Sequence, residues 1–166
     1  MKRNQAIKTF TDLYEWTVGN DSLVSSFIKG HLVIEFLLIK IVALSHSKLL
    51  SFAEGLNHYK LIQLAHGLGY ISEGQKDTLI LVNQMRNKFA HQLTYEPSIS
   101  DLRLVLTRAS ESFDDLTDGI MQGLDEINGK TSLSDCEDWM IPELFVQISY
   151  DLHSVYQELG GDMEDF

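Results

Sequence analysis

The sequence is poor in cysteine and proline, with one cysteine and two prolines in 166 residues. A disulfide needs two thiols, so no bridge can form within the chain, and one chain cannot supply a cysteine cluster for a metal. The single thiol, Cys136, lies among acidic neighbours, which oppose formation of a reactive thiolate. We therefore expect neither a disulfide scaffold nor a cysteine nucleophile.

Long hydrophobic runs are also lacking. The most apolar stretch, HLVIEFLLIKIVAL over 31–44, is interrupted by Glu35 and Lys40 and is shorter than the roughly 20 residues that a membrane-spanning helix needs. No hydrophobic segment with a small-residue cleavage site follows the basic N-terminal tip, so a secretory signal is not predicted. We expect a cytoplasmic protein without a membrane partner, and a buried helix over 31–44.

Basic residues are scarce, at 13 Lys and Arg against 24 Asp and Glu, and the net charge is −11. Such a charge repels nucleic acid at long range and does not indicate a broad DNA-binding surface. A few cations gathered in one cleft still act within a Debye length, about 8 Å at physiological salt. The charge also leaves open an acidic protein that mimics nucleic acid, with its carboxylates spread over a helical bundle.

What the sequence does contain is hydrophobic periodicity typical of helices. It shows no alternating strand pattern, Gly-rich phosphate loop or internal repeat. The segments with helical periodicity are 4–18, 21–47, 58–69, 73–91, 101–127 and 142–159. Because the length suits one domain, we predict a single all-α domain over 1–166, a bundle of five or six helices around a long central helix.

Capping residues predict several of the helix ends. Asp21 is placed to cap the second helix. Ser72 and Gln75 have the S-x-x-Q spacing of a capping box, which predicts the start of the helix over 73–91. Pro142 suits the first turn of the last helix, because its fixed φ is helical and its missing N–H has no partner there in any case.

The helix over 73–91 ends in QMRNKFAH, a polar last turn and a half. At 100° per residue, one sector collects four polar side chains, those of Asn83, Arg86, Asn87 and His91. Arginine offers phosphate a planar fork of donors, and histidine can take or give a proton near neutral pH. The sector can therefore stabilise charge and catalyse proton transfer without a metal. Alternatively, these side chains only satisfy the last carbonyls of the helix and interact with its dipole.

RNKFAH over 86–91 resembles the R-N-x(3–5)-H motif of the HEPN superfamily, small all-helical domains of which many are metal-independent ribonucleases of toxin, CRISPR and anti-phage systems. A wider stretch, approximately 24–105, is similar to the mannitol operon repressor family, which has a G-L-G turn, here Gly67-Leu68-Gly69, before its long helix. The two resemblances are compatible, because the repressor family is itself HEPN-like in helix order. They imply a HEPN-like core over about 21–127 and a C-terminal helix over about 142–159.

The HEPN resemblance implies a symmetric homodimer in which both motif helices face one cleft. Arg86 would hold the scissile phosphate of an RNA substrate, Asn87 would orient it, and His91 would act as acid or base, leaving a 2′,3′-cyclic phosphate. Asn83 and Glu35 would support these residues. Such an endoribonuclease would serve a bacterial stress, toxin–antitoxin or anti-phage defence system, with an antitoxin as a protein partner. The repressor resemblance implies instead a non-catalytic regulator that binds another protein.

His31 and Glu35 are four residues apart on the predicted central helix, a spacing that can bind a metal. No third ligand is close in sequence, so a buried hydrogen-bonded pair, or a contact from Glu35 to a cation such as Arg86, is favoured. Three further histidines, His46, His58 and His66, are scattered along the sequence, and we expect each of them at the surface or at a helix cap. We therefore predict no metal and no cofactor.

Overall fold

The structure is a computed structural model, which describes residues 7–18, 23–92 and 95–166. Over these residues the chain forms eight α-helices: α1 (Phe10–Thr17), α2 (Leu23–Ser45), α3 (Leu50–Gly55), α4 (His58–Gly67), α5 (Glu73–His91), α6 (Ile99–Ser112), α7 (Gly119–Glu126) and α8 (Met140–Glu158). Two short 3₁₀ helices accompany them, η1 (Ser47–Leu49) and η2 (Leu133–Asp135). The predicted all-α class is confirmed, whereas Asp21, the predicted cap of α2, lies outside the described residues.

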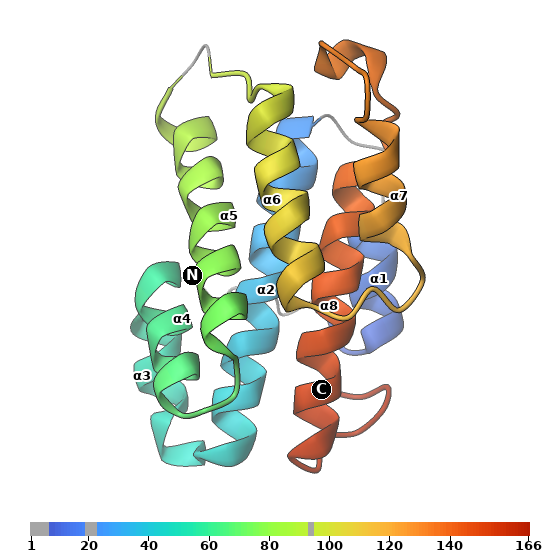
Figure 1. The fold of residues 1–166 in the computed structure, drawn as a ribbon. Helices are drawn as coiled ribbons and strands as arrows, with labels where there is room; N and C mark the ends of the chain where they lie inside the picture. Colours follow the sequence, from blue (N-terminus) through green and yellow to red (C-terminus); the bar gives the residue numbers. More distant parts are fainter. Residues whose placement is uncertain (1–6, 19–22, 93–94) are drawn as a thin grey trace.

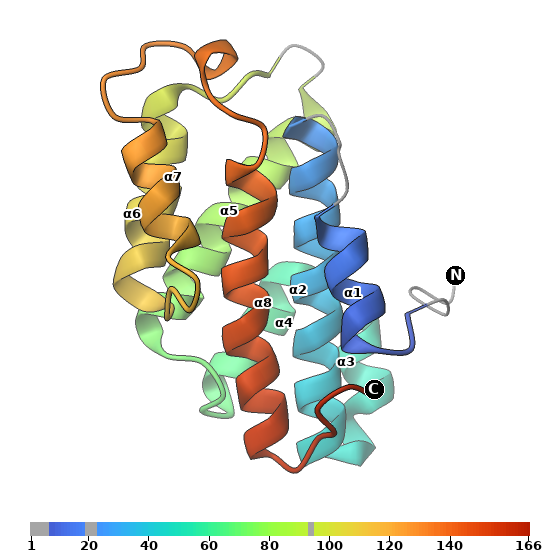
Figure 2. The ribbon, with the colours of Figure 1, turned by 90° about the vertical axis from the view of Figure 1, so that its right-hand side faces the viewer.

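The longer helices run roughly along one axis, with α2 and α8 side by side at the centre (Figures 1 and 2). Helix α5 packs against α2, α4 and α6, and α7 packs against α6 and α8. The short helices α3 and α4 lie beside one end of α2, and α1 covers the outside of α2 and α8. Helix α5 therefore forms one side of the bundle and ends at the opposite end from α3 and α4.

The centre of the bundle is the contact between α2 and α8. Helix α2 is buried over most of its length, as predicted for the central helix. A Cβ atom at Gly30 would lie 2.0 Å from Cγ of Phe145, so only glycine lets α8 come this close. Phe27 and Phe145 meet edge to face with ring centroids 5.5 Å apart, both fully buried. This close packing holds the middle of α2, which carries His31 and Glu35, in a fixed place.

The helix count differs from the predicted five or six in two places. Helix α3 forms where no helix is predicted, and the predicted helix over 101–127 is divided into α6 and α7. The carboxylate of Asp115 accepts hydrogen bonds from the backbone N–H groups of Ile120 (2.9 Å) and Met121 (2.8 Å) at the start of α7. A side chain that satisfies these amides favours a new helix start over a continuous helix.

Helix α5 begins where the sequence predicts. Ser72 Oγ accepts a hydrogen bond from the N–H of Gln75 (3.2 Å), and Gln75 Oε1 accepts one from the N–H of Ser72 (2.9 Å). The capping box is thus formed in both directions. Gly69, at φ +83°, ends α4 just before it, in a left-handed conformation that glycine adopts without strain. The end of α4 and the start of α5 together fix where α5 begins, and so where the motif at its C-terminal end lies.

Among the described helices, none combines the length and the hydrophobicity needed to cross a bilayer.

Candidate functional site

The motif lies on the last turn and a half of α5, and the hydrophobic side of that helix fixes its orientation. Leu79, Val82 and Met85 are at most 2% exposed and face the core. With this side held inside, Arg86, Asn87 and His91 are carried on other sides of the helix. Of the described helices, α2, α4 and α6 pack against α5, and none of the described helices is drawn on the outer side of its C-terminal end (Figure 1).

Three motif residues reach the surface there. Arg86 is half-buried, and Asn87 and His91 are exposed. Arg86 Nη1 donates a hydrogen bond to Oδ1 of Asn87 at 3.3 Å. The small side chain of Ala90, between the arginine and the histidine, is exposed as well. The structure therefore places an arginine–asparagine pair and a histidine on the accessible end of one helix.

Asn83, which the helical wheel groups with the motif, points into the bundle instead. It is 7% exposed, and its Oδ1 lies 3.1 Å from Nε2 of His31 on α2. Because an amide oxygen only accepts, the hydrogen of this bond belongs to Nε2 of His31. Asn83 therefore connects α5 to the interior of α2 and does not belong to the exposed part of the motif.

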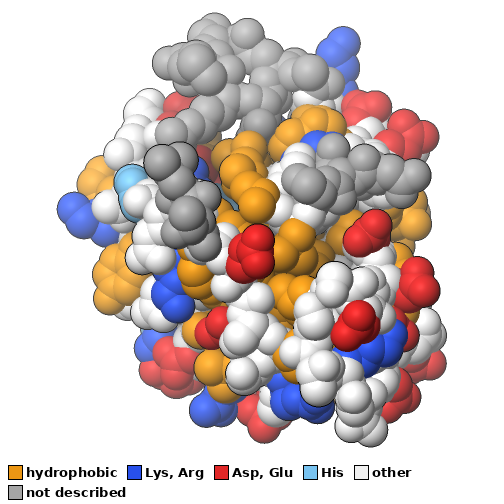
Figure 3. All heavy atoms as spheres, turned by 90° about the horizontal axis from the view of Figure 1, so that it is seen from above, with side chains coloured by type: hydrophobic (Ala, Val, Ile, Leu, Met, Phe, Trp, Pro, Cys, Tyr) orange, Lys and Arg blue, Asp and Glu red, His pale blue; other side chains and the backbone are white. Residues whose placement is uncertain are grey.

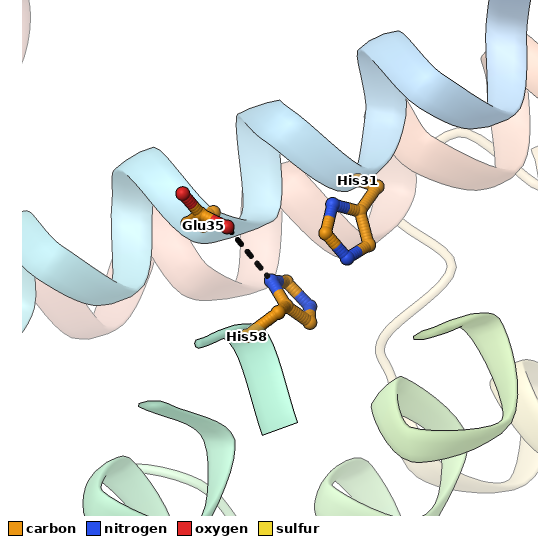
Figure 4. A group of neighbouring side chains, drawn as sticks. All are labelled: His31, Glu35 and His58. Atoms are coloured by element: carbon orange, nitrogen blue, oxygen red, sulfur yellow. Dashed lines mark ion pairs between the residues drawn. The ribbon is translucent and has the colours of Figure 1, made fainter. Parts of the chain in front are cut away.

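His31 is one of four residues that form a buried polar group: His31, Glu35, His58 and Asn83 (Figure 4, which draws the first three). His31 and His58 have ring centroids 3.7 Å apart, with planes tilted by 31°. Glu35 Oε2 lies 3.6 Å from Nδ1 of His58, an ion-pair distance but too long for a hydrogen bond. None of the four is more than 7% exposed, so α2, α4 and α5 join through polar side chains inside the bundle.

His31 is neutral at physiological pH. Burial and the neighbouring His58 lower the pKa of His31 to about 3, with a smaller effect of Arg86, although the hydrogen bond to Asn83 opposes the shift. Since Nε2 carries the hydrogen of the neutral ring, Nδ1 presents a lone pair. This Nδ1 is buried and has no hydrogen-bond partner within the described chain.

Arg86 lies between the buried polar group and the surface. Its charge acts on His31, and its Nε is buried without a hydrogen-bond partner among the described residues. Its Nη1, in contrast, reaches the exposed Asn87. The guanidinium therefore makes its hydrogen bond to Asn87 on the outer side, at Nη1, while its Nε is buried.

The same end of the bundle contains a cavity of about 680 Å³, on the side of α5 that carries Phe89. Its described lining comes mainly from the residues around Tyr95 to Leu102 and around Thr131 to Ile141, and includes none of the three motif residues. Figure 3 views this end, where hydrophobic side chains lie near the centre of the face and Asp and Glu side chains lie around them. Because none of the three motif residues lines it, the cavity is a feature separate from the motif.

His58, and the contact that Glu35 makes with it, are not predicted from the sequence. His58 was expected at the surface or as a cap, but it is 5% exposed, and the cap of α4 is Asn57, whose side chain accepts from the N–H of Lys60. Glu35 is paired with His58 and not with Arg86 as one alternative suggested. The available signal was the place of His58 in the sequence, directly after Asn57, a residue type that caps helices. Asn57 caps α4, so His58 is the first residue of a helix that packs on α2.

Comparisons of the chain with protein-family models, curated proteins and solved structures found no match.

Proposed function

We propose that this chain is a HEPN-like, metal-independent endoribonuclease. The observation that supports the proposal is the accessible Arg86–Asn87 pair with His91 on the same helix end. These are the side chains that phosphoryl chemistry on RNA needs: a donor fork for the phosphate, an amide to orient it and a proton carrier. We also propose that the enzyme acts in a bacterial stress, toxin–antitoxin or anti-phage defence system.

In the proposed reaction, the RNA 2′-oxygen attacks the adjacent phosphorus and the bond to the 5′-oxygen breaks. Arg86 binds the non-bridging oxygens, whose negative charge grows in the transition state. One histidine takes the proton of the 2′-hydroxyl, and another gives a proton to the leaving 5′-oxygen. The products are a 2′,3′-cyclic phosphate and a 5′-hydroxyl, with no step that needs a metal.

Two proton carriers per site are the chemical reason to propose a homodimer. Each chain brings one His91, and a two-fold axis beside the end of α5 brings the second histidine and a second Arg86 into one cleft. Two arginines also offset the repulsion between RNA and a chain of net charge −11.

A hydrophobic strip on α2 supports a dimer on this side of the bundle. Val24 and Ile28 remain 40% and 37% exposed, although α2 is otherwise mostly buried. At 100° per residue they fall within about 60° of His31 and Glu35, the residues of α2 that face α4 and α5. A second copy of the chain would cover this strip and bring the two motif helices together.

The test is cleavage of varied RNAs in excess chelator. We expect products with 2′,3′-cyclic phosphate ends, and no cleavage of the same sequences with 2′-O-methyl groups, which lack the attacking hydroxyl. His91→Gln should lower the rate by about a hundredfold or more. Arg86→Lys, which keeps the charge but loses the fork, should lower it less.

The matched control is His46→Gln, which changes another exposed histidine, located after α2 at the other end of the bundle. It should leave the rate unchanged. For the dimer, Ile28→Glu should give monomers in analytical ultracentrifugation and lose cleavage, whereas Leu104→Glu, at another exposed hydrophobic residue, should do neither. A folded wild type that cleaves none of the RNAs would contradict the proposal and favour a non-catalytic regulator that acts by binding protein.

A further inference from the structure

The buried polar group contains three side chains whose ligand atoms lie close together. One nitrogen of His31, one nitrogen of His58 and one carboxylate oxygen of Glu35 all lie within 4.8 Å of one another. We propose that His31, Glu35 and His58 bind a divalent transition-metal ion of the zinc class. The site is distinct from the proposed ribonuclease motif, whose chemistry uses no metal, and it does not depend on that function.

The spacing of the three groups fits one metal ion. Zinc holds histidine nitrogens and carboxylate oxygens about 2.1 Å away, which puts neighbouring ligands about 3.4 Å apart in tetrahedral geometry. The pair formed by Glu35 Oε2 and His58 Nδ1 is already at 3.6 Å. The three ligand atoms all lie within 4.8 Å of one another, so the distances between them need to shorten by up to about 1.4 Å around an ion.

Three of the four ring nitrogens of the group lack a hydrogen bond to any described residue. Within the described chain, Nδ1 of His31 and both ring nitrogens of His58 are buried and have no hydrogen-bond partner. Buried polar atoms are nearly always satisfied, so three such nitrogens at one place need an explanation. A metal ion that accepts one lone pair from each ring provides it for one nitrogen of each histidine.

Asn83 prepares His31 for this role. Its Oδ1 accepts the hydrogen of His31 Nε2 at 3.1 Å, which fixes the tautomer and leaves the lone pair of the neutral ring on Nδ1. Histidines that bind metals are usually oriented by such a bond from their other nitrogen. Asn83 thus acts as a positioning residue for the site.

The donor set indicates the class of ion. Two neutral imidazoles and one carboxylate suit zinc, cobalt, nickel or iron, whereas magnesium and calcium prefer oxygen ligands only. Glu35 supplies one negative charge inside the bundle, which offsets part of the charge of a divalent ion. Three protein ligands leave at least one coordination position for water.

A bound ion would join two helices that are distant along the chain. His31 and Glu35 belong to α2, and His58 is the first residue of α4, which packs against both α2 and α5. An ion that binds only the folded chain stabilises it by an amount that grows with the logarithm of the free ion concentration above the dissociation constant. The expected role is therefore structural: the ion holds the start of α4 on the middle of α2.

The test is a titration of the full chain, without an affinity tag and after dialysis against a chelator, with Co²⁺ and then Zn²⁺. We expect visible absorption typical of a tetrahedral or five-coordinate cobalt site, saturating at one ion per chain and displaced by Zn²⁺. At about a hundredfold excess of Zn²⁺ over its dissociation constant, Tm should rise by about 5 °C or more. Mg²⁺ at the same concentration should have no effect.

Variants of the ligands test the site residue by residue. His58→Gln and Glu35→Gln should weaken Co²⁺ binding by at least about tenfold, as should Asn83→Ala through the loss of orientation. His46→Gln is the matched control and should bind like the wild type. Circular dichroism of each metal-free variant separates loss of binding from loss of fold.

Wild-type protein that is folded and binds no Co²⁺ or Zn²⁺ would overturn the proposal and leave the group as a buried polar contact. Binding that His58→Gln and Glu35→Gln, both folded, do not weaken would overturn it as well. If a ligand variant does not fold, the wild-type stoichiometry and the cobalt spectrum still decide. Ribonuclease assays in chelator are scored separately, so failure of one proposal is distinguishable from failure of the other.

Discussion

Asn83 and Asn87 lie about one turn apart on α5 and have opposite surroundings. Asn83 is buried and accepts a hydrogen bond from His31, whereas Asn87 is exposed and accepts one from Arg86. The same type of side chain thus accepts a hydrogen bond from a buried histidine at one position and from an accessible arginine at the other. The burial and the hydrogen-bond partner of a polar residue on α5 therefore depend on whether it faces a neighbouring helix. They cannot be predicted from the residue type alone.

The difference extends to the groups that contain these two residues. The buried polar group has ring nitrogens without hydrogen bonds, and its surroundings of low polarity make each contact strong and each missing partner costly. The exposed motif is hydrated, so removing one of its side chains costs little stability. Changes in the buried polar group should therefore affect folding or metal binding, and changes in the motif should affect chemistry.

The largest effect on the buried side is expected from Gly30→Ala. The new Cβ would lie 2.0 Å from Cγ of Phe145, so α2 and α8 must move apart next to His31. We expect a loss of about 3 kcal/mol in the free energy of unfolding, measured with urea. Gly55→Ala, where nothing lies within 4 Å of the new Cβ, is the control and should change stability little. Equal effects at the two glycines would show that the contact between α2 and α8 is not tight.

The paired variants Asn83→Ala and Asn87→Ala test the comparison itself. Asn83→Ala leaves the N–H of His31 Nε2 buried without a partner and should cost about 2 kcal/mol in unfolding free energy. Asn87→Ala should change stability by less than about 0.5 kcal/mol and lower the rate of RNA cleavage. Urea unfolding and cleavage are measured on both. A larger loss of stability in Asn87→Ala than in Asn83→Ala would contradict the burial of Asn83 and the exposure of Asn87.

A smaller effect is expected from His153 on α8, a buried histidine outside both groups. Its ring stacks on Phe10 with centroids 4.0 Å apart, and Tyr156 and Phe166 also lie beside it. Burial lowers the pKa of His153, although Glu164 opposes the shift. As the pH falls through about 6.5, the unfolded chain binds a proton that the folded chain does not, so stability decreases.

His153→Phe keeps an aromatic ring against Phe10 and removes this titration. The urea midpoint of the variant should therefore fall less than that of the wild type between pH 7.5 and pH 5.5. Identical decreases in the two proteins would mean that His153 does not contribute to the loss of stability in acid.

Much of the fold was predictable because it depends on local signals. The capping box of Ser72 and Gln75 and the hydrophobic periodicity of α2 act within a few residues, and both predictions are confirmed. The division between α6 and α7 was missed because helical periodicity continues across it, while the side chain of Asp115 makes bonds that end one helix and start another. The polar composition of FDDLTDG was the available signal for that turn.

The buried polar group was less predictable, because its members meet only through tertiary packing. The spacing of His31 and Glu35 suggested a pair of ligands, but the third group, His58, is 23 residues further along than Glu35 and on another helix. A helical wheel places Asn83 with the motif because it contains no information about which helix lies alongside. Arg86, Asn87 and His91 all lie on α5, so helical periodicity alone was enough to group them at the end of one helix. Their role in a site remains a prediction.

The proposed ribonuclease activity is tested most directly by the rate of RNA cleavage in excess chelator, measured for the wild type, His91→Gln and His58→Gln and normalised to folded protein. We predict that the wild type and His58→Gln cleave at similar rates and leave cyclic phosphate ends, while the rate of His91→Gln falls by about a hundredfold or more. Cleavage that disappears in chelator, or that His91→Gln retains in full, would contradict it.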